Sequence, residues 1–417
     1  MTSPSPGPAD KKIGGLEFIL LMGLVQALQA LAVDSMLPAL GEMARELGSR
    51  DPNERQLVVG VFLIFSGLGC LVPGALADRF GRRPVLLGCI AAYVTCSAAC
   101  GLVKNFQQLL VLRAMVGFAC AGLAVLPAAI IRDLHEGDRM ARMQSTVSMV
   151  FMIVPMIAPS VGQAILLMAS WRWIFGVMAL MGTALAIWIS LRLPETLRRE
   201  YRQPISLPNI GRSMIEVTTT RAALGYVFGM ALIQSAMFGY INSCQQLVGE
   251  HFGAGTRFPL IFAGMAMVMA CTNFINSRIV MRFGARRVSH TALVVYIATS
   301  ALQFYMATRP DETLWQFVPM MTLNMCLLGF LGANFSSIAL QPFARKAGAA
   351  SSAQAFIRMV LASWLGALIG QAFDGTARPL AAALLTAGCG CLALILYSEK
   401  GELFRRRNPP GTTYPIA

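Results

Sequence analysis

The sequence predicts an all-α integral membrane protein with twelve transmembrane helices in two six-helix halves. Three observations lead to this prediction. The 417 residues are 56% hydrophobic but only 13% charged, whereas soluble domains carry about 25% charged residues. The apolar residues fall into twelve long runs, and a helix needs about 20 mostly apolar residues to cross the hydrocarbon core of a bilayer. A short basic sequence recurs about half the chain apart, which indicates two related halves.

The twelve predicted spans are continuous apolar runs with short polar segments between them. They do not alternate as the strands of a membrane barrel do. The spans cover roughly residues 15–38, 54–77, 84–103, 107–131, 141–167, 172–193, 221–248, 256–280, 287–307, 314–338, 350–373 and 377–397. The first run is too long for a signal-peptide core and lacks a small-residue cleavage site, so we expect it to be retained as a span.

The basic residues predict the orientation of these spans. With the N-terminus inside, 24 Lys/Arg fall in cytoplasmic segments, 8 in outer segments and 2 within spans, which accounts for all 34. An excess of Lys/Arg on one side marks the cytoplasmic side. We therefore expect a multi-pass protein of the cell inner (plasma) membrane with both termini in the cytoplasm.

The longest polar interruption divides the chain into its halves. We therefore predict five segments: a disordered cytoplasmic N-terminus (1–13), a first half (14–197), a cytoplasmic linker (198–220), a second half (221–398) and a cytoplasmic tail (399–417). Arg79-Phe80-Gly81-Arg82-Arg83 follows the second span, and Arg282-Phe283-Gly284-Ala285-Arg286-Arg287 follows the eighth, starting 203 positions later. Parallel repeats of this kind build transporters whose substrate site lies between the halves near mid-membrane.

Composition excludes several other classes of protein. The net charge is +14, but the charges form short clusters between apolar runs and no basic face for nucleic acid. The ten cysteines include no C-x-x-C pair and no Cys/His cluster, so we predict no disulfide, metal or other cofactor. The three histidines fall at span ends without a catalytic spacing, which argues against an enzyme. A receptor or channel would leave the two halves unexplained.

The segment after the second predicted span carries a specific motif. It reads Gly74-Ala-Leu-Ala-Asp78-Arg79-Phe80-Gly81-Arg82-Arg83-Pro84 and resembles the G-x-L-x-D-R-x-G-R-[KR] loop of the major facilitator superfamily. The resemblance implies that Gly74, Asp78, Arg79, Gly81, Arg82 and Arg83 form a gating cluster on the cytoplasmic side. The second copy has Met281 in place of Asp78 and Ser277 in place of Gly74, so we do not assume a matching latch there.

Three further matches narrow the resemblance to one branch. Asp34-Ser-Met-Leu-Pro38-Ala-Leu is similar to the D-x-x-x-P-x-L pattern of twelve-helix drug/proton antiporters. Arg113 and Gly117 resemble the family's helix-4 motif. Pro155-Met-Ile-Ala-Pro159-Ser-Val-Gly162 is similar to the antiporter motif of helix 5, with Ala-Pro in place of the usual Gly-Pro. Together they resemble the bicyclomycin and chloramphenicol-resistance branch.

Two ionisable residues lie within predicted spans at similar depth. Asp34 is about 6 Å and Arg113 about 9 Å from the outer ends of their spans, at 1.5 Å per residue. Such residues are costly in lipid, about 2.5–3.5 kcal/mol each on insertion scales, and usually functional. A salt bridge between them, broken when Asp34 is protonated, would couple transport to protons. Alternatively, Asp34 caps a helix end and Arg113 reaches outward to water. Gln26 stands where some relatives carry a second acid.

The substrate site is predicted from the helices that line the half-interface in this superfamily. Arg358 either contacts an anionic substrate or pairs near the inner gate. The candidate ligands are amide, sulfur, aromatic and cationic side chains: Gln26, Gln29, Met152, Phe238, Asn242, Asn334 and Arg358. Amides flanked by Met and Phe suit a neutral or lipophilic molecule, and methionines give an adaptable surface.

The resemblance implies a proton-coupled exporter of drugs or small lipophilic or metabolite molecules that works by alternating access. The alternative is a dedicated exporter of one physiological solute, such as a sugar, siderophore or amino-acid derivative. The expected partners are a small-molecule substrate, protons and the lipid bilayer, and the expected state is a monomer.

Overall fold

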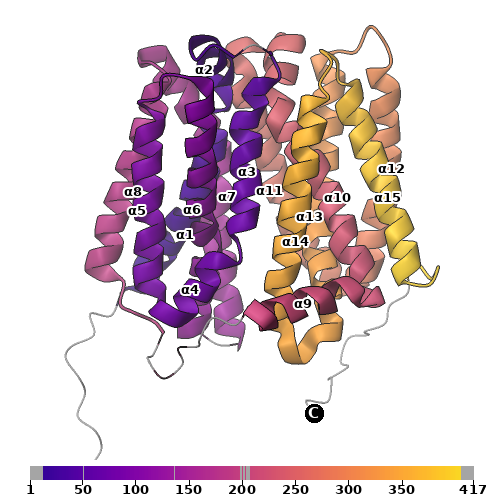
Figure 1. Ribbon diagram of the computed structural model, residues 1–417. Helices are drawn as coiled ribbons and strands as arrows, with labels where there is room; N and C mark the ends of the chain where they lie inside the picture. Colours follow the sequence, from indigo (N-terminus) through magenta and orange to yellow (C-terminus); the bar gives the residue numbers. More distant parts are fainter. Residues whose placement is uncertain are drawn as a thin grey trace, which may run out of the picture. The chain divides into compact units, whose positions relative to one another are not determined.

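The computed structural model describes residues 13–49, 51–135, 137–197, 200, 202 and 207–404. Every regular element in these ranges is a helix (Figure 1). Most of the predicted N-terminal tail, part of the predicted linker and most of the predicted C-terminal tail lie outside the described residues. The predicted all-α class is confirmed.

The helices form two compact units. The first comprises Met1–Met36 and Gly69–Ile205, and the second Leu37–Leu68 and Ser206–Ala417. The first unit contains α1 (Gly15–Asp34), α4 (Val72–Phe80), α5 (Arg82–Cys100), α6 (Phe106–Leu134), α7 (Gly137–Met168) and α8 (Arg172–Arg192). The second contains α2 (Leu40–Glu46), α3 (Leu57–Gly69), α9 (Leu207–Thr219), α10 (Arg221–Cys244), α11 (Phe258–Phe283), α12 (Ala285–Ala307), α13 (Leu314–Leu340), α14 (Ala347–Gln371) and α15 (Arg378–Ser398).

This grouping differs from the predicted halves in one segment. Residues 37–68, expected in the first half, are packed with the second unit. Within that unit, a Cβ on Gly67 of α3 would lie 3.1 Å from the backbone nitrogen of Val360 in α14. Helix α3 therefore packs closely against α14, and the sequence boundaries at 197 and 221 stay a prediction.

Each predicted span overlaps a helix or a bent pair of helices. Ten helices in the described residues are long and apolar enough to cross a bilayer. An eleventh is counted if Glu54–Gly69 and Val72–Phe80, bent by 43°, form one broken span. Helix α12 takes the place of the span predicted at 287–307 but is not among the ten, because charged and hydroxyl residues interrupt its apolar sequence.

Small residues bring helices together where lipid cannot drive their association. A Cβ on Gly162 of α7 would lie 1.8 Å from the carbonyl oxygen of Ser35, just after α1, and one on Gly23 of α1 would lie 2.6 Å from Val150. In membranes such close contacts replace the hydrophobic force that packs soluble helices. Glycine at these two points thus allows α1 and α7 to pack closely.

The predicted linker contains a helix that the sequence analysis did not anticipate. Helix α9 lies across the direction of the helices beside it (Figure 1), and it packs against α10 and α14 of the same unit. The hydroxyls of its Thr218 and Thr219, and of Thr220 just after it, donate to carbonyls one turn earlier. These bonds close the last turn of α9 before α10 begins at Arg221.

Candidate functional site

The turn between α4 and α5 requires glycine. Gly81 has φ 109° and ψ 156°, a backbone region that is essentially restricted to glycine. A Cβ there would also lie 2.5 Å from the Glu195 carboxylate. Glu195 accepts the backbone N–H groups of Arg82 at 2.9 Å and Arg83 at 3.2 Å. The carboxylate thus caps the start of α5, where the helix dipole favours negative charge.

Arg82 is the centre of an ion-pair network at this turn. Its Nη1 lies 2.7 Å from Asp78, one turn earlier, and its Nε lies 2.9 Å from Asp133 at the end of α6. The Arg82 side chain is 4% exposed and that of Asp133 is 13% exposed, whereas that of Asp78 is 50% exposed. We call Asp78, Arg82, Asp133 and Glu195 the motif cluster. It joins α4, α5, the end of α6 and the segment after α8.

The other residues of the predicted gating motif surround this cluster. Arg83 also donates from Nη2 to the Ser190 carbonyl, and the exposed Arg79 lies over the ring of Phe80 at 5.2 Å. The atom nearest to a Cβ on Gly74 is Val125 Cγ1 at 3.9 Å, an ordinary contact. Among the described residues, Gly74 therefore makes no close backbone contact that would require glycine.

Sequence reasoning did not identify Asp133 and Glu195 as members of the site. Both belong to short segments that resemble the family's sequence pattern, Arg132-Asp133 and Leu193-Pro-Glu195. The signal that could have revealed them is an acid directly after a predicted span, together with an arginine of the motif that needs a further acidic partner.

The second unit repeats this arrangement with different partners. Gly284 has φ 85° and ψ 148° before α12, in the same region of backbone space as Gly81. Arg286 Nε donates to Glu399 at 2.9 Å, and Glu399 is 3% exposed. Arg286 and Glu399 each lie 204 positions after Arg82 and Glu195. The repeated positions thus meet in both units, through the backbone N–H of Arg82 in the first unit and through the side chain of Arg286 in the second.

Asp34 and Arg113 are both buried in the first unit, with 6% and 0% exposure. Asp34 is the last residue of α1, where the helix dipole gives a carboxylate no stabilisation. Arg113 Nη2 donates to the carbonyl oxygen of Ala32 at 3.0 Å, rather than to the Asp34 carboxylate. The predicted direct salt bridge is thus not the contact made here, although Arg113 binds the same turn of α1. Its full burial excludes the outward-reaching orientation.

The predicted antiporter motif lies on the helix beside Asp34. Pro155 and Pro159 are inside α7, where each removes a backbone donor. One turn further on, Gly162 meets the Ser35 carbonyl, next to Asp34 in the chain. The motif therefore sets how closely α7 approaches the end of α1 that carries the buried acid.

The predicted substrate residues are divided between the units. Gln26 and Gln29 of α1 and Met152 of α7 are half-buried in the first unit. Four others belong to the second unit: Phe238, Asn242, Asn334 and Arg358.

Two of the four residues in the second unit have assigned polar partners. Arg358 Nη1 donates to Gln234 Oε1 at 2.5 Å, so it has a partner within its own unit. Asn334 Nδ2 donates to the carbonyl of Phe330 at 2.7 Å and lies 3.3 Å from Asn276 Oδ1.

Asn242 differs from the other amides of the second unit. It is 2% exposed, and neither its nitrogen nor its oxygen has a hydrogen-bond partner in the described part of the chain. Buried amides are normally bonded. Gly60 of α3 and Gly370 of α14 pack closely beside it, because a Cβ on them would lie 3.8 Å from Asn242 Oδ1 and 2.9 Å from Asn242 Cβ.

A polar network that the sequence analysis missed lies near Asn242. Arg55 and Glu250 form a bidentate ion pair with two contacts of 2.6 Å. Gln56 donates to Gln246. These contacts join the short 3-10 helix Glu54–Gln56, just before α3, to the π-helix Gln245–His251 after α10. Arg55 and Glu250 are 195 positions apart, so spacing alone gives no sign of the pair.

Comparisons with known proteins agree with this architecture. The chain is 28% identical over 385 residues to a bicyclomycin resistance protein homolog of Haemophilus influenzae, covering 91% of this chain and 95% of that one. It is 29% identical over 365 residues to the multidrug resistance protein MdtL of Klebsiella pneumoniae, covering 85% and 89%.

Solved structures share the fold at lower sequence identity. A D-xylose–proton symporter matches with TM-score 0.69 and 15% identity, covering 93% of this chain and 98% of that one. A POT peptide transporter in complex with sulfate matches with TM-score 0.73 and 14% identity, covering 93% and 94%. The family model "Major Facilitator Superfamily" matches residues 22–370. The chain therefore belongs to the Major Facilitator Superfamily and is a multi-pass membrane transporter rather than an enzyme.

Proposed function

We propose that this transporter exports drugs or other small lipophilic molecules in exchange for protons, by alternating access. The observation that carries the proposal is Asp34. It is a carboxyl group buried at the end of a spanning helix, on the turn that Arg113 contacts. Burial and a nearby cation act in opposite directions on the charge of an acid, and a site balanced in this way can gain and lose a proton during a transport cycle.

The names of the relatives support the direction and the substrate class. The relatives are named for resistance to bicyclomycin and to multiple drugs, and export of toxic compounds is the way in which a membrane transporter would give such resistance. The lipophilic substrate class also agrees with the candidate ligands, which are mostly amides, sulfur and aromatic rings. We further propose Asn242 as a hydrogen-bonding contact for substrate, because its amide is buried without partners in the described residues.

We extend the proposal to the location and topology of the protein, the role of the motif cluster and the oligomeric state. The basic asymmetry supports placement in the plasma membrane with both termini in the cytoplasm. The motif cluster is proposed to bias the inner gate, since Asp78 is exposed enough to change partners while Arg82 stays bound to Asp133. The protein is proposed to act as a monomer.

Drug susceptibility tests the proposed substrate class. Expression in a bacterium without its major efflux pumps should raise the inhibitory concentration of at least one lipophilic compound in a chemically varied panel. The Asp34→Asn variant, expressed to the same level, should lose this protection. Protection that persists in Asp34→Asn would contradict the role of Asp34, and no protection against any compound would favour a dedicated solute exporter.

A further inference from the structure

A groove of about 440 Å³ lies among α11, α12 and α13 of the second unit. Its walls are mostly apolar side chains of three helices and of the segment after α15: Ile279, Phe283, Arg287, Val288, Thr291, Ala292, Val295, Leu327, Phe330 and Phe404. Val295 and Phe283 are 40% and 47% exposed, so the groove opens on the surface of the unit. Such a groove on a membrane helix faces lipid.

The side chains of α12 that line the groove change from cationic to apolar along the helix. Arg287, Thr291 and Val295 are spaced by four residues and share one helix face. They extend over about 12 Å, at 1.5 Å per residue. The groove is thus cationic at the end of α12 that is predicted to be cytoplasmic, and apolar toward the membrane interior. A ligand that matches it has an anionic head and a hydrocarbon chain.

The cationic end is built by the chain segment after α15. The Phe404 N–H donates to His290 Nδ1 at 3.0 Å, and Arg287 Nε donates to the Phe404 carbonyl at 3.1 Å. The Phe404 ring meets the His290 ring edge-on with centroids 5.9 Å apart. Phe404 thereby forms the rim of the groove, and the bond from Arg287 holds the guanidinium beside it.

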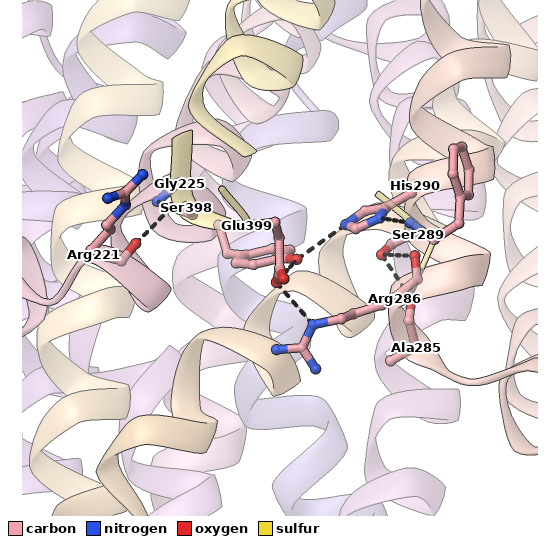
Figure 2. Close-up of polar contacts among 10 residues, drawn as sticks. Arg221, Gly225, Ala285, Arg286, Ser289, His290, Ser398 and Glu399 are labelled. Carbon is pink, nitrogen blue, oxygen red and sulfur yellow. Dashed lines mark hydrogen bonds and ion pairs between the residues drawn. The ribbon is translucent and has the colours of Figure 1, made fainter. Parts of the chain in front are cut away.

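A buried hydrogen-bond chain fixes His290 in turn. The Tyr226 hydroxyl donates to Glu399 at 2.7 Å, so the contact of 3.0 Å between Tyr226 and His290 Nε2 requires the imidazole to donate. Figure 2 shows Arg286 pointing to Glu399, and His290 on the neighbouring turn of α12. His290 is therefore the neutral tautomer with hydrogen on Nε2, which leaves Nδ1 free to accept from Phe404.

The charges at this end favour an anion. Arg287 and Arg282 are both exposed there. Glu399 is buried and already accepts from Arg286 and Tyr226, so its charge is compensated within the unit. Glu402 is exposed on the same segment, but it does not line the groove.

We propose that this groove binds an anionic phospholipid of the cytoplasmic leaflet. The phosphate lies at the guanidinium of Arg287, and one acyl chain follows Thr291 and Val295 against Leu327 and Phe330. Anionic lipids of that leaflet attract each Lys or Arg near the surface by about 1 kcal/mol. None of the lining residues belongs to the motif cluster or the substrate set, although the Phe330 carbonyl accepts a hydrogen bond from Asn334.

The test uses phosphatidylglycerol with a photoreactive diazirine in its acyl chain. The probe is added to full-length protein in phosphatidylcholine nanodiscs, and cross-linked peptides are located by mass spectrometry. Cross-links should concentrate on Thr291–Val295 and Leu327–Phe330. Diazirine-labelled phosphatidylcholine should give a much lower yield there, which tests head-group selection without any substitution.

Two variants and a matched control complete the experiment. Arg287→Gln should lower the phosphatidylglycerol yield about fivefold, the ratio for one cationic contact. Arg212→Gln, the same charge change at an exposed position on α9, should leave it unchanged. Thr291→Trp should block the acyl path while Arg287 remains. Equal yields from the two lipids, equal yields in Arg287→Gln and Arg212→Gln, or cross-links spread over all lipid-facing helices would overturn the proposal.

Discussion

Asp34→Asn is expected to abolish uphill export driven by a pH gradient while leaving the protein folded. Asparagine has nearly the size of aspartate and cannot cycle a proton, so the change removes coupling without opening a cavity. Asp34 is 6% exposed at the end of α1, and a buried acid within a span costs too much to be retained for packing alone. Substrate binding should remain measurable, since the candidate substrate ligands are other residues.

The measurement is substrate accumulation in reconstituted vesicles with an imposed pH gradient. Glu42→Gln provides the matched control, because it makes the same change from acid to amide at an exposed position on α2. It should transport at the parent rate. If Asp34→Asn still concentrates substrate as fast as Glu42→Gln does, the coupling role belongs to another residue, and Glu17, which pairs with Arg192, would be examined next.

Arg82→Gln is expected to cause the largest loss of stability among substitutions in the motif cluster. It leaves Asp133, whose side chain is 13% exposed, without its cation at 2.9 Å. Removing one partner of a buried ion pair typically costs about 3–5 kcal/mol. The yield of monodisperse protein in detergent and its apparent Tm should both fall.

Arg79→Gln is the matched control for this change. Arg79 carries the same charge in the same motif but is exposed, with a ring contact to Phe80, and surface substitutions usually change stability by no more than about 0.5 kcal/mol. Adding Asp133→Asn to Arg82→Gln should restore part of the stability, because it removes the uncompensated carboxylate. Equal apparent Tm values for Arg82→Gln and Arg79→Gln would show that the network does not stabilise the fold.

The sequence predicted the helices well because hydrophobic length is a strong, local signal. It also placed Asp78, Gly81 and Arg82 together at the turn between α4 and α5, since these residues are close neighbours in the chain. It missed Asp133 and Glu195, because the partners of Arg82 come from the ends of α6 and α8. Pairing across helices depends on how the helices pack, which spacing within one segment does not encode.

The contact between Asp34 and Arg113 shows the same limit. Asp34 and Arg113 were predicted to lie at similar distances from the outer ends of their spans. The structure does bring Arg113 to the turn that ends at Asp34. Depth could not say that the guanidinium meets the Ala32 carbonyl instead of the carboxylate, because that depends on helix rotation. The pair Arg286–Glu399 was missed for the same reason as Glu195, although both acids stand 113 positions after their arginines.

The central claim is that substrate and protons move in opposite directions through one protein. The most direct measurement is internal pH in vesicles that contain the purified transporter and a trapped pH-sensitive dye, after substrate is added outside without an imposed gradient. We expect substrate entering the vesicle to drive protons out, so that the interior becomes alkaline, and Asp34→Asn to give no change in pH. Acidification of the interior, or substrate entry with no proton movement in the parent protein, would show that the transporter is not a proton antiporter.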